Sequence, residues 1–243
     1  MSDALSGRVA VIADSHIDGP GGEAGPLIAQ VRAIRDQRCD RLLLLGDLFQ
    51  AWVGFPQFEP SGLAELLAAI SELRARGVRV DYLEGNRDFF LAKSPYATFF
   101  DFVGNEIAFV AGGVRYLAVH GDGLDDKDRQ YRMWRWATKS FPVRLAMRFL
   151  PARLARRLVD STERKLAQTN FKHRLAIPTA AIDRFAARRL GEGHDALLLG
   201  HFHEGRRWQV PGGEVRLLPA WFDSRRIEWL GAEGDLNAES GRA

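Results

Sequence analysis

Residues 195–203 read Asp-Ala-Leu-Leu-Leu-Gly-His-Phe-His, an apolar run that ends in two histidines. A short, continuously apolar run of this kind predicts a buried β-strand. His201 and His203 follow that strand two residues apart, so both imidazoles can turn toward one point. Neutral histidine is the commonest metal ligand among protein side chains. The pair therefore predicts part of a metal site, with two surface histidines on a loop as the alternative.

Four other predicted strands end in side chains of the same kind. Apolar runs at 8–13, 42–45 and 78–83 are separated by helical patterns, and the run at 114–119 closes a hairpin. The alternation of strands and helices predicts parallel strands with helical crossovers. The side chains at the five strand ends are Asp14, His16, Asp47, Asn86, His120, His201 and His203.

These seven side chains are expected to converge, because the carboxyl ends of the strands define the binding crevice of an open α/β sheet. Two aspartates, one asparagine and four histidines are too many ligands for one ion. They suit two divalent cations that share a bridging carboxylate, and the mixture favours two Mn²⁺, with iron, magnesium or zinc as alternatives. A helix cap could explain any single one of these residues, but not ligand-type residues at all five strand ends.

Composition and charge bound the class of protein. The chain has 243 residues, a net charge of +3 and no run of eighteen apolar residues, which predicts a globular domain without a membrane span. Its N-terminus lacks a secretory signal, and the single Cys39 is expected to be a packing residue in a cytoplasmic protein. Residues 139–174 carry a charge of +8 and the remainder −5, so nucleic-acid binding is not expected. We expect one domain over 1–232, with a helical insertion at about 125–175 and a flexible tail at 233–243.

Taken in order, the motifs Asp14-x-His16, Gly46-Asp47, Gly85-Asn86, His120 and Gly200-His201-x-His203 resemble those of the calcineurin-like metallophosphoesterases. The resemblance covers nearly the whole chain and implies an α/β fold, a four-layer αββα sandwich with a helical lid insertion. It assigns Asp14, His16, Asp47 and His203 to one metal, and Asp47, Asn86, His120 and His201 to the other, with Asp47 bridging. Two such cations would lower the pKa of water and supply hydroxide for attack on phosphorus.

Arg87, the residue after Asn86, narrows the class of ester. Phosphodiesterases of the superfamily commonly place a histidine there, which can protonate a poor leaving group. Arginine cannot donate a proton usefully, but it clamps phosphate in a fork. A site with a clamp and no acid suits a leaving group that needs no proton. A phosphomonoester is such a group, because its second pKa is about 6. Arg87 therefore predicts cleavage of a pyrophosphate bond. The alternative role of Arg87 is a surface salt bridge.

The residues around these motifs are similar to the UDP-2,3-diacylglucosamine pyrophosphohydrolase family of lipid A biosynthesis. The similar stretches are Gly46-Asp-Leu-Phe-Gln-Ala-Trp-Val-Gly54, Gly85-Asn-Arg-Asp-Phe-Phe90 and His120-Gly-Asp-Gly-Leu. The resemblance implies a lipid-linked nucleotide sugar as substrate, and UMP and a diacylglucosamine 1-phosphate as products. It implies catalytic roles for Arg87, Asp47 and Asn86. It also implies substrate contacts from Asn86, Arg87, Asp128, Tyr131, Asn170, His201 and either Lys172 or His173. Trp52 is a candidate for stacking on a base or lining an acyl groove.

The basic insertion has a physical interpretation of its own. Leu145, Phe149 and Leu154 lie among arginines, and such a stripe can bury acyl chains or lie on an anionic membrane surface. Together with the resemblance to the lipid A biosynthesis family, this implies a peripheral protein on the inner face of the inner membrane. The alternative is a helical pair that packs its leucines on the core.

Two residues depart from the pattern of the family. Gln50 stands where the family has an acidic residue, and Phe222 stands where it has a histidine. Both departures bear on the substrate rather than on the metal site.

The sequence therefore predicts a dinuclear metal-dependent hydrolase that splits a nucleotide-sugar lipid pyrophosphate. An enzyme acting on another nucleotide pyrophosphate or on a phosphodiester is the first alternative. A non-catalytic scaffold on the same fold is the second, although a scaffold would be expected to lose ligands and none is missing here.

Overall fold

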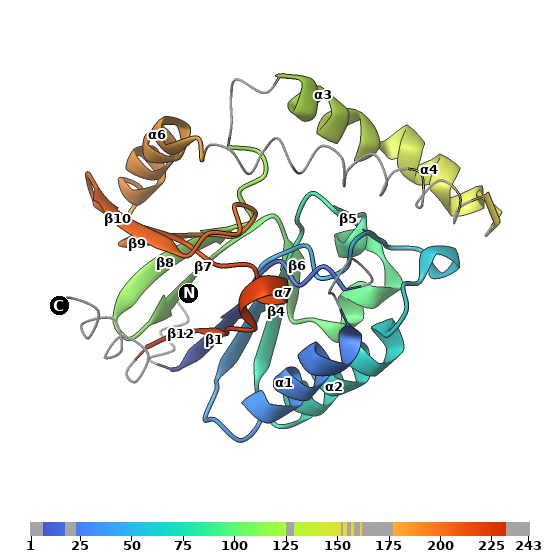
Figure 1. Cartoon of the computed structure of the whole chain (residues 1–243), viewed down its shortest axis with the longest axis horizontal. Helices are drawn as coiled ribbons and strands as arrows, with labels where there is room; N and C mark the ends of the chain where they lie inside the picture. The colour runs from blue at the N-terminus through green and yellow to red at the C-terminus, as the bar shows by residue number, and fades with distance from the viewer. Residues whose placement is uncertain are drawn as a thin grey trace.

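The computed structural model describes residues 7–17, 23–124, 129–151, 153, 154, 157, 161 and 177–231. Two five-stranded sheets pack face to face, and helices cover both outer faces (Figure 1). This arrangement is the predicted four-layer αββα sandwich. The predicted domain boundaries, and the tail at 233–243, remain predictions.

The first sheet has the strand order β12-β1-β2-β4-β6, and α1 and α2 lie side by side against its outer face (Figure 1). β1, β2, β4 and β6 are parallel, as the alternating pattern predicted, and only β12 runs antiparallel, beside β1. The bounds are β1 Val9–Ile12, α1 Ala24–Ile34, β2 Arg41–Leu44, α2 Leu63–Ala75, β4 Arg79–Leu83, β6 Phe102–Gly104 and β12 Glu228–Leu230.

The second sheet has the order β10-β11-β9-β8-β7, and α6 covers its outer face (Figure 1). The predicted hairpin is present, since β7 and β8 pair antiparallel around Gly112-Gly113. β9, the strand before the histidine pair, runs parallel between β8 and β11. The bounds are β7 Glu106–Ala111, β8 Val114–Val119, α6 Thr179–Leu190, β9 Ala196–Leu199, β10 Arg206–Val210 and β11 Gly213–Leu217.

The continuous apolar runs follow from this layering, because a strand buried on both faces needs apolar side chains at every position. In β1, Val11 points into the core between the sheets, whereas Ile12 packs against α1 and α2. In β9, Leu198 faces the other sheet and Leu197 packs under α6. Cys39 is buried and its thiol bonds to the Arg41 carbonyl, in keeping with the predicted packing role.

Several short elements carry no periodicity from which they could be predicted. β3 and β5 form a two-stranded parallel ladder, and four short helices lie in the connections. The bounds are β3 Trp52–Val53, η1 Pro56–Phe58, β5 Asp88–Phe89, η2 Leu91–Lys93, η3 Pro95–Phe99 and α7 Trp221–Ser224.

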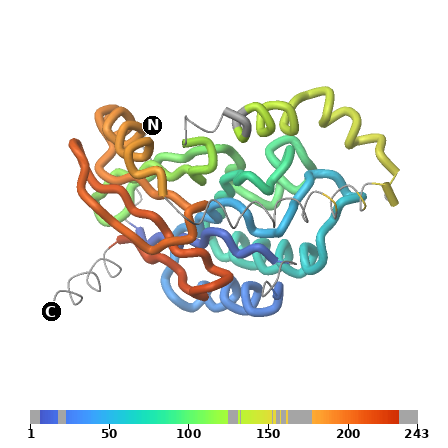
Figure 2. The backbone as a smooth tube through the Cα atoms, turned by 45° about the horizontal axis from the view of Figure 1, so that its top comes forward, coloured from blue at the N-terminus to red at the C-terminus, as the bar shows by residue number. Residues whose placement is uncertain are grey.

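Two helices of the predicted insertion are described, α3 at Arg129–Thr138 and α4 at Phe141–Phe149. This α3–α4 segment runs along the side of the molecule near β5, away from α1 and α2 (Figures 1 and 2). Among the described residues, no helix is long and apolar enough to cross a bilayer.

Candidate metal centre

The loops that leave β1, β2, β4, β8 and β9 carry the seven predicted ligands, which together are called the ligand rim below. Five rim residues adopt positive φ: Asp14 (53°), His16 (43°), Asp47 (53°), His201 (62°) and His203 (58°). This conformation is uncommon for residues other than glycine and costs about 1–2 kcal/mol each. Strain of this kind concentrates at functional sites, where the surrounding structure enforces it.

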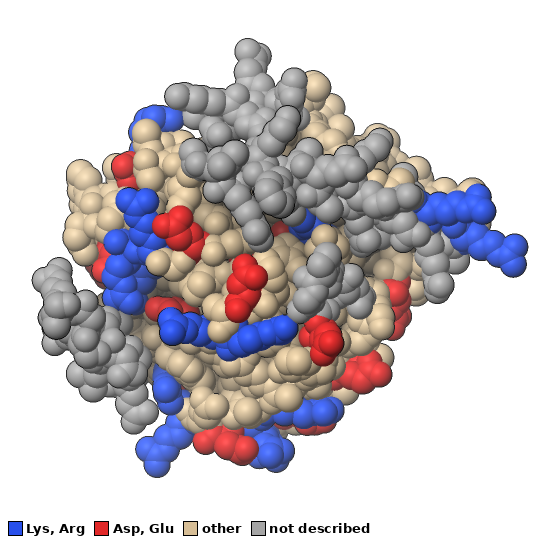
Figure 3. All heavy atoms as spheres, in the orientation of Figure 1, with Lys and Arg blue, Asp and Glu red and all other residues tan. Residues whose placement is uncertain are grey.

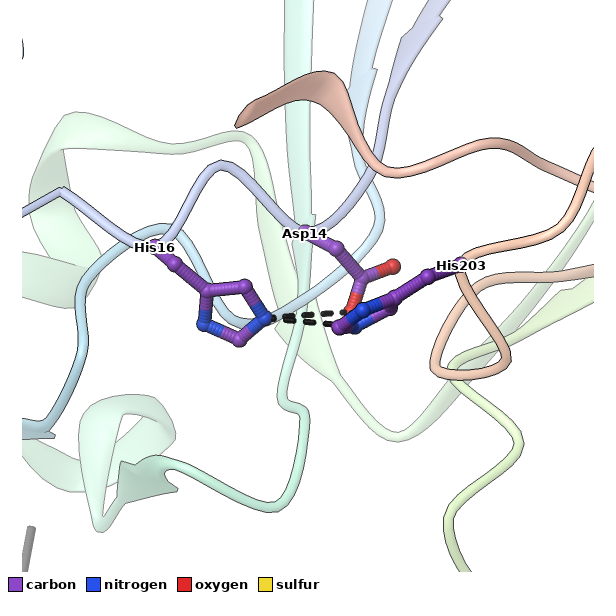
Figure 4. Close-up of side chains that lie close together, drawn as sticks. All are labelled: Asp14, His16 and His203. Carbon is purple, nitrogen blue, oxygen red and sulfur yellow. Dashed lines mark hydrogen bonds and ion pairs between the residues drawn. The ribbon is translucent and has the colours of Figure 1, made fainter. Parts of the chain in front are cut away.

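Three side chains of the rim meet at one point, although they come from opposite ends of the sequence (Figure 4). Asp14 Oδ1 lies 3.2 Å from His203 Nε2 and 3.9 Å from His16 Nε2. The two Nε2 atoms are 3.3 Å apart. A carboxylate and two imidazoles at these separations can share one cation.

A second group lies beside the first and shares Asp14 with it. His120 Nε2 is 3.6 Å from Asp47 Oδ2 and 4.0 Å from Asp14 Oδ1. Asn86 Oδ1 lies 3.2 Å from His120 Nε2 and 2.9 Å from His201 Nδ1. The structure therefore brings all seven side chains together. The carboxylate common to both groups is Asp14, and the bridging role of Asp47 stays a prediction.

The donor set fits a divalent cation. Asp14 Oδ1 is buried and accepts no hydrogen bond from any residue that the structure describes, although it faces three imidazole nitrogens. A buried anionic oxygen without a partner is costly, and a cation among these nitrogens removes that cost. The other carboxylate oxygen of Asp14 accepts a 2.9 Å hydrogen bond from the His201 main-chain nitrogen, which fixes the direction in which Oδ1 points.

The electrostatics of the rim favour the metal-binding forms of four ligands, Asp14, Asp47, His16 and His201, but not of His120. Burial raises the pKa of Asp14 and of Asp47, but the adjacent His120 and other imidazoles outweigh it and hold both below the ordinary value. Burial lowers the pKa of His16 and of His201 to about 4. Burial also opposes the charge on His120, yet Asp47 and Asp14 raise its pKa to about 10. A cation bound between the same two carboxylates would take the place of that proton.

Glycines precede the ligands because there is no room for a larger residue. A Cβ on Gly200 would lie 2.8 Å from Asp14 Oδ2. A Cβ on Gly85 would meet the Asp47 carboxylate and lie 2.9 Å from His120 Cε1. The Gly-Asn and Gly-His pairs of the sequence are therefore steric requirements of the rim.

Arg87 is held inside the site and not on the surface. Its side chain is 2% exposed, with Nε 3.7 Å from Asp47 Oδ2. Its guanidinium donates to the Gln50 carbonyl at 3.1 Å, and its main-chain nitrogen donates to Asp47 Oδ1 at 2.9 Å. The alternative of a surface salt bridge is therefore wrong. The contact from Gln50 comes from its main chain, so the replaced side chain takes no part in it.

Two carboxylates near the rim were given no role on sequence grounds. Asp88 accepts hydrogen bonds from the main-chain nitrogens of Asp47 (2.9 Å) and Gly85 (2.8 Å), and so ties two ligand loops together. Burial, followed by the charge of Asp47, raises the pKa of Asp88 to about 7. Asp122 lies two residues beyond His120 and bonds to α3. Their polar identity at strand ends was visible in the sequence, but the backbone groups they contact were not.

The predicted substrate contacts are only partly described. The Tyr131 hydroxyl donates to Asp122 at 2.6 Å. Trp52 is fully buried among Phe49, Tyr82 and Tyr96, so it has no exposed ring surface for a base or an acyl chain, and its predicted substrate contact is wrong. Four predicted contacts lie outside the described residues: Asp128, Asn170, Lys172 and His173.

Phe222 packs against the rim at the position where the resembling family has histidine. Its ring makes edge contacts with His16 and His203, at centroid distances of 5.4 and 5.5 Å. The main-chain nitrogen of Phe222 also donates to the Asp14 carbonyl at 3.3 Å. The departure therefore places an apolar wall beside the first ligand group and leaves its three ligands in place.

Residues 7–205 match the family described as calcineurin-like phosphoesterase. The chain belongs to this family. Three relatives named UDP-2,3-diacylglucosamine hydrolase cover most of it. The protein of Ralstonia nicotianae is 29% identical over 89% of this chain and 85% of its own length. The protein of Sodalis glossinidius is 28% identical over 86% of this chain and 88% of its own length. That of Yersinia pseudotuberculosis serotype O:1b is 30% identical over 80% of each.

The family membership fixes the class of reaction. A calcineurin-like phosphoesterase with hydrolases as relatives is a hydrolase of phosphoric esters or pyrophosphates. The fold implies divalent metals, and the rim supplies candidate ligands for them.

Proposed function

We propose that this phosphoesterase cleaves the pyrophosphate bond of UDP-2,3-diacylglucosamine, releasing UMP and 2,3-diacylglucosamine 1-phosphate. The observation that carries the proposal is the buried Arg87 guanidinium beside Asp47, at the position where an acid would protonate a poorer leaving group. The names of the three relatives support the same substrate.

The rim would hold two Mn²⁺ in this proposal. Asp14, His16, Asp47 and His203 would bind one ion, and Asp47, Asn86, His120 and His201 the other. Divalent cations in such a site polarise phosphoryl oxygens and lower the pKa of bound water.

The chain's own side chains then orient the substrate. Arg87 presents a fixed, permanently charged fork to the phosphoryl oxygens, because its guanidinium is already anchored by the Gln50 carbonyl. Asp88 joins the Asp47 and Gly85 loops through two main-chain hydrogen bonds, which holds the two loops that carry Asp47 and Asn86 at a fixed separation. The resulting phosphomonoesters leave without a protein acid.

The α3–α4 segment supplies a surface suited to a lipid substrate. Trp136 is 76% exposed and Phe149 74% exposed, and Phe141 and Leu145 are exposed as well. Leu154 is also half exposed, whereas Met147 and Leu150 pack against the buried Val53 and Phe58, so among the described residues the alternative of apolar side chains packed on the core holds only in part. Exposed Arg148 lies in the same segment and exposed Arg153 lies just beyond it, and Figure 3 shows basic side chains projecting at this end of the molecule. We infer that this face rests on an anionic membrane, the inner face of the inner membrane.

Mass spectrometry with purified, Mn²⁺-loaded protein tests the substrate. We expect release of UMP from UDP-2,3-diacylglucosamine, and none from the Asp47→Ala variant prepared in parallel. The departures at Gln50 and Phe222 favour one competing outcome, turnover of a soluble nucleotide pyrophosphate or a phosphodiester. Turnover of those substrates, with the diacylated sugar left intact, would replace the proposed substrate and keep the reaction class.

A further inference from the structure

Asp122 ties α3 to the end of β8. The residue is 8% exposed and lies two positions beyond the rim residue His120. Its Oδ2 accepts a 2.6 Å hydrogen bond from the Tyr131 hydroxyl and a 2.7 Å hydrogen bond from Arg135 Nε. Charge-assisted bonds of this length are the stronger kind, and a carboxylate this buried needs them to offset its desolvation.

The far end of α3 is tied to a different sheet. Lys139 Nζ donates to the Gly85 carbonyl at 2.8 Å and lies 5.8 Å from the Phe89 ring. Trp134 meets the same ring edge-on at 6.3 Å. Gly85 follows β4 in the first sheet, whereas Asp122 follows β8 in the second. The helix therefore bridges both sheets beside the rim.

The apolar packing of α3 is limited. Two of its large side chains, Met133 and Trp136, are mostly exposed. An amphipathic helix normally stays in place by burying its apolar side chains, and these two contribute little to that. The polar bonds to Asp122 are thus a main determinant of where α3 lies.

We propose that Asp122 is a positioning residue that fixes α3 beside the ligand rim, so that the helix forms one wall of the substrate site. This role adds to the proposed hydrolase function, and only its kinetic test depends on that function. In this proposal Asp122 acts through Arg135 and Tyr131, to which its carboxylate is bonded, and not as a ligand of the rim.

The experiment compares Asp122→Asn with Arg135→Gln, which breaks the same contact from the helix side. Arg189→Gln is the matched control, because it breaks a 2.8 Å ion pair between α6 and Glu106 that also joins a helix to a strand. Three quantities are measured for each full-length, Mn²⁺-loaded variant: metal content, amide hydrogen exchange over 129–138, and kinetics. The kinetics use UDP-2,3-diacylglucosamine and, separately, a small aryl phosphodiester.

For both Asp122→Asn and Arg135→Gln we expect exchange of the α3 amides to rise at least about tenfold, and KM for the lipid substrate to rise by a similar factor. Metal content and turnover of the aryl phosphodiester should stay at the wild-type level. The double variant should be no worse than Asp122→Asn alone, because the two residues share one interaction. The control should leave α3 exchange and both activities unchanged.

Unchanged α3 exchange in both variants would overturn the proposal. Loss of metal from Asp122→Asn but not from Arg135→Gln would also overturn it, because Asp122 would then act on His120. Failure of the wild-type protein to release UMP would refute the proposed substrate. The exchange measurement would still decide the role of Asp122 in that case.

Discussion

The ligand rim and the α3–α4 segment lie next to each other and are built in opposite ways. Rim side chains such as Asp14 and His120 are buried, and the loops that carry them are held by strained backbone and by contacts to glycine. Large side chains of the segment, such as Trp136 and Phe149, point to solvent, and its helices are held by polar bonds together with a few apolar contacts, such as those of Trp134 and Met147. In the proposed function, the chemistry belongs to the buried strand ends, whereas substrate access and membrane contact would belong to the more exposed α3–α4 segment.

The severest test of this difference is Asp47→Ala in the rim. We expect both metals to be lost and activity to fall by about a thousandfold or more, because metal polarisation contributes several kcal/mol to the barrier. Metal analysis and initial rates check the result. Retention of one metal per chain would show that Asp47 does not bridge.

Gly85→Ala tests whether the rim is as rigid as its close contacts indicate. The added methyl group would push against the Asp47 carboxylate and the His120 ring. We expect a loss of about 1–3 kcal/mol in stability and metal affinity about 10–100-fold weaker, measured by denaturant unfolding and metal titration. Gly123→Ala is the matched control, because its Cβ would meet nothing within 4 Å. Equal effects of the two substitutions would contradict a steric role for Gly85.

Arg87→Ala separates the phosphate clamp from the metal site. The guanidinium contacts the Asp47 carboxylate and the Gln50 carbonyl, and it belongs to neither ligand group. We expect kcat to fall by roughly 100-fold with metal content unchanged, in the range of a lost charge-assisted contact to the transition state. Arg87→Lys should recover only part of the rate, since an ammonium cannot form the fork. A purely structural role predicts instead that metal loss accompanies the loss of rate.

The mildest change is expected on the exposed face of the segment. Trp136→Ser with Phe149→Ser should weaken binding to anionic vesicles by about tenfold, because these rings would no longer enter the interface. Unfolding stability should stay within about 0.5 kcal/mol, as is usual for exposed positions. Flotation with anionic and with neutral vesicles measures the binding. Equal flotation of the variant and the wild-type protein would remove the segment from the membrane contact.

The fold could be predicted from sequence wherever periodicity reflects burial. The runs ending at Asp14, Asp47 and Asn86 are buried on both faces, so their apolar pattern was unambiguous. β3 and β5 have two residues each, which is too short for any period to emerge. The helices α3 and α4 could be predicted from the sequence, but their orientation could not, because a helix with an exposed apolar face gives no sign of which side meets the core.

The candidate site was predictable for a different reason. Asp14 and His203 follow strand ends, which meet at one edge of the sheets independently of the conformation of the connecting loops. The residue types at the strand ends were therefore enough to predict the ligands. The Trp52 prediction failed because the sequence does not distinguish an aromatic residue in the core from one that lines a binding groove. The tie between Asp122 and Arg135 could not be foreseen, since it depends on the packing of a helix and not on sequence spacing.

The rim also determines when the protein can complete its active form during synthesis. Asp14 and His201 are 187 positions apart, and the main-chain nitrogens of Trp221 and Phe222 bond to the carbonyls of Ala13 and Asp14. At roughly 5–20 residues per second, the ribosome adds the later half of the centre on the order of ten seconds or more after the first. A nascent chain therefore carries an incomplete set of ligands until His203 has emerged. Capture of a divalent metal by the complete rim would have to wait until that point.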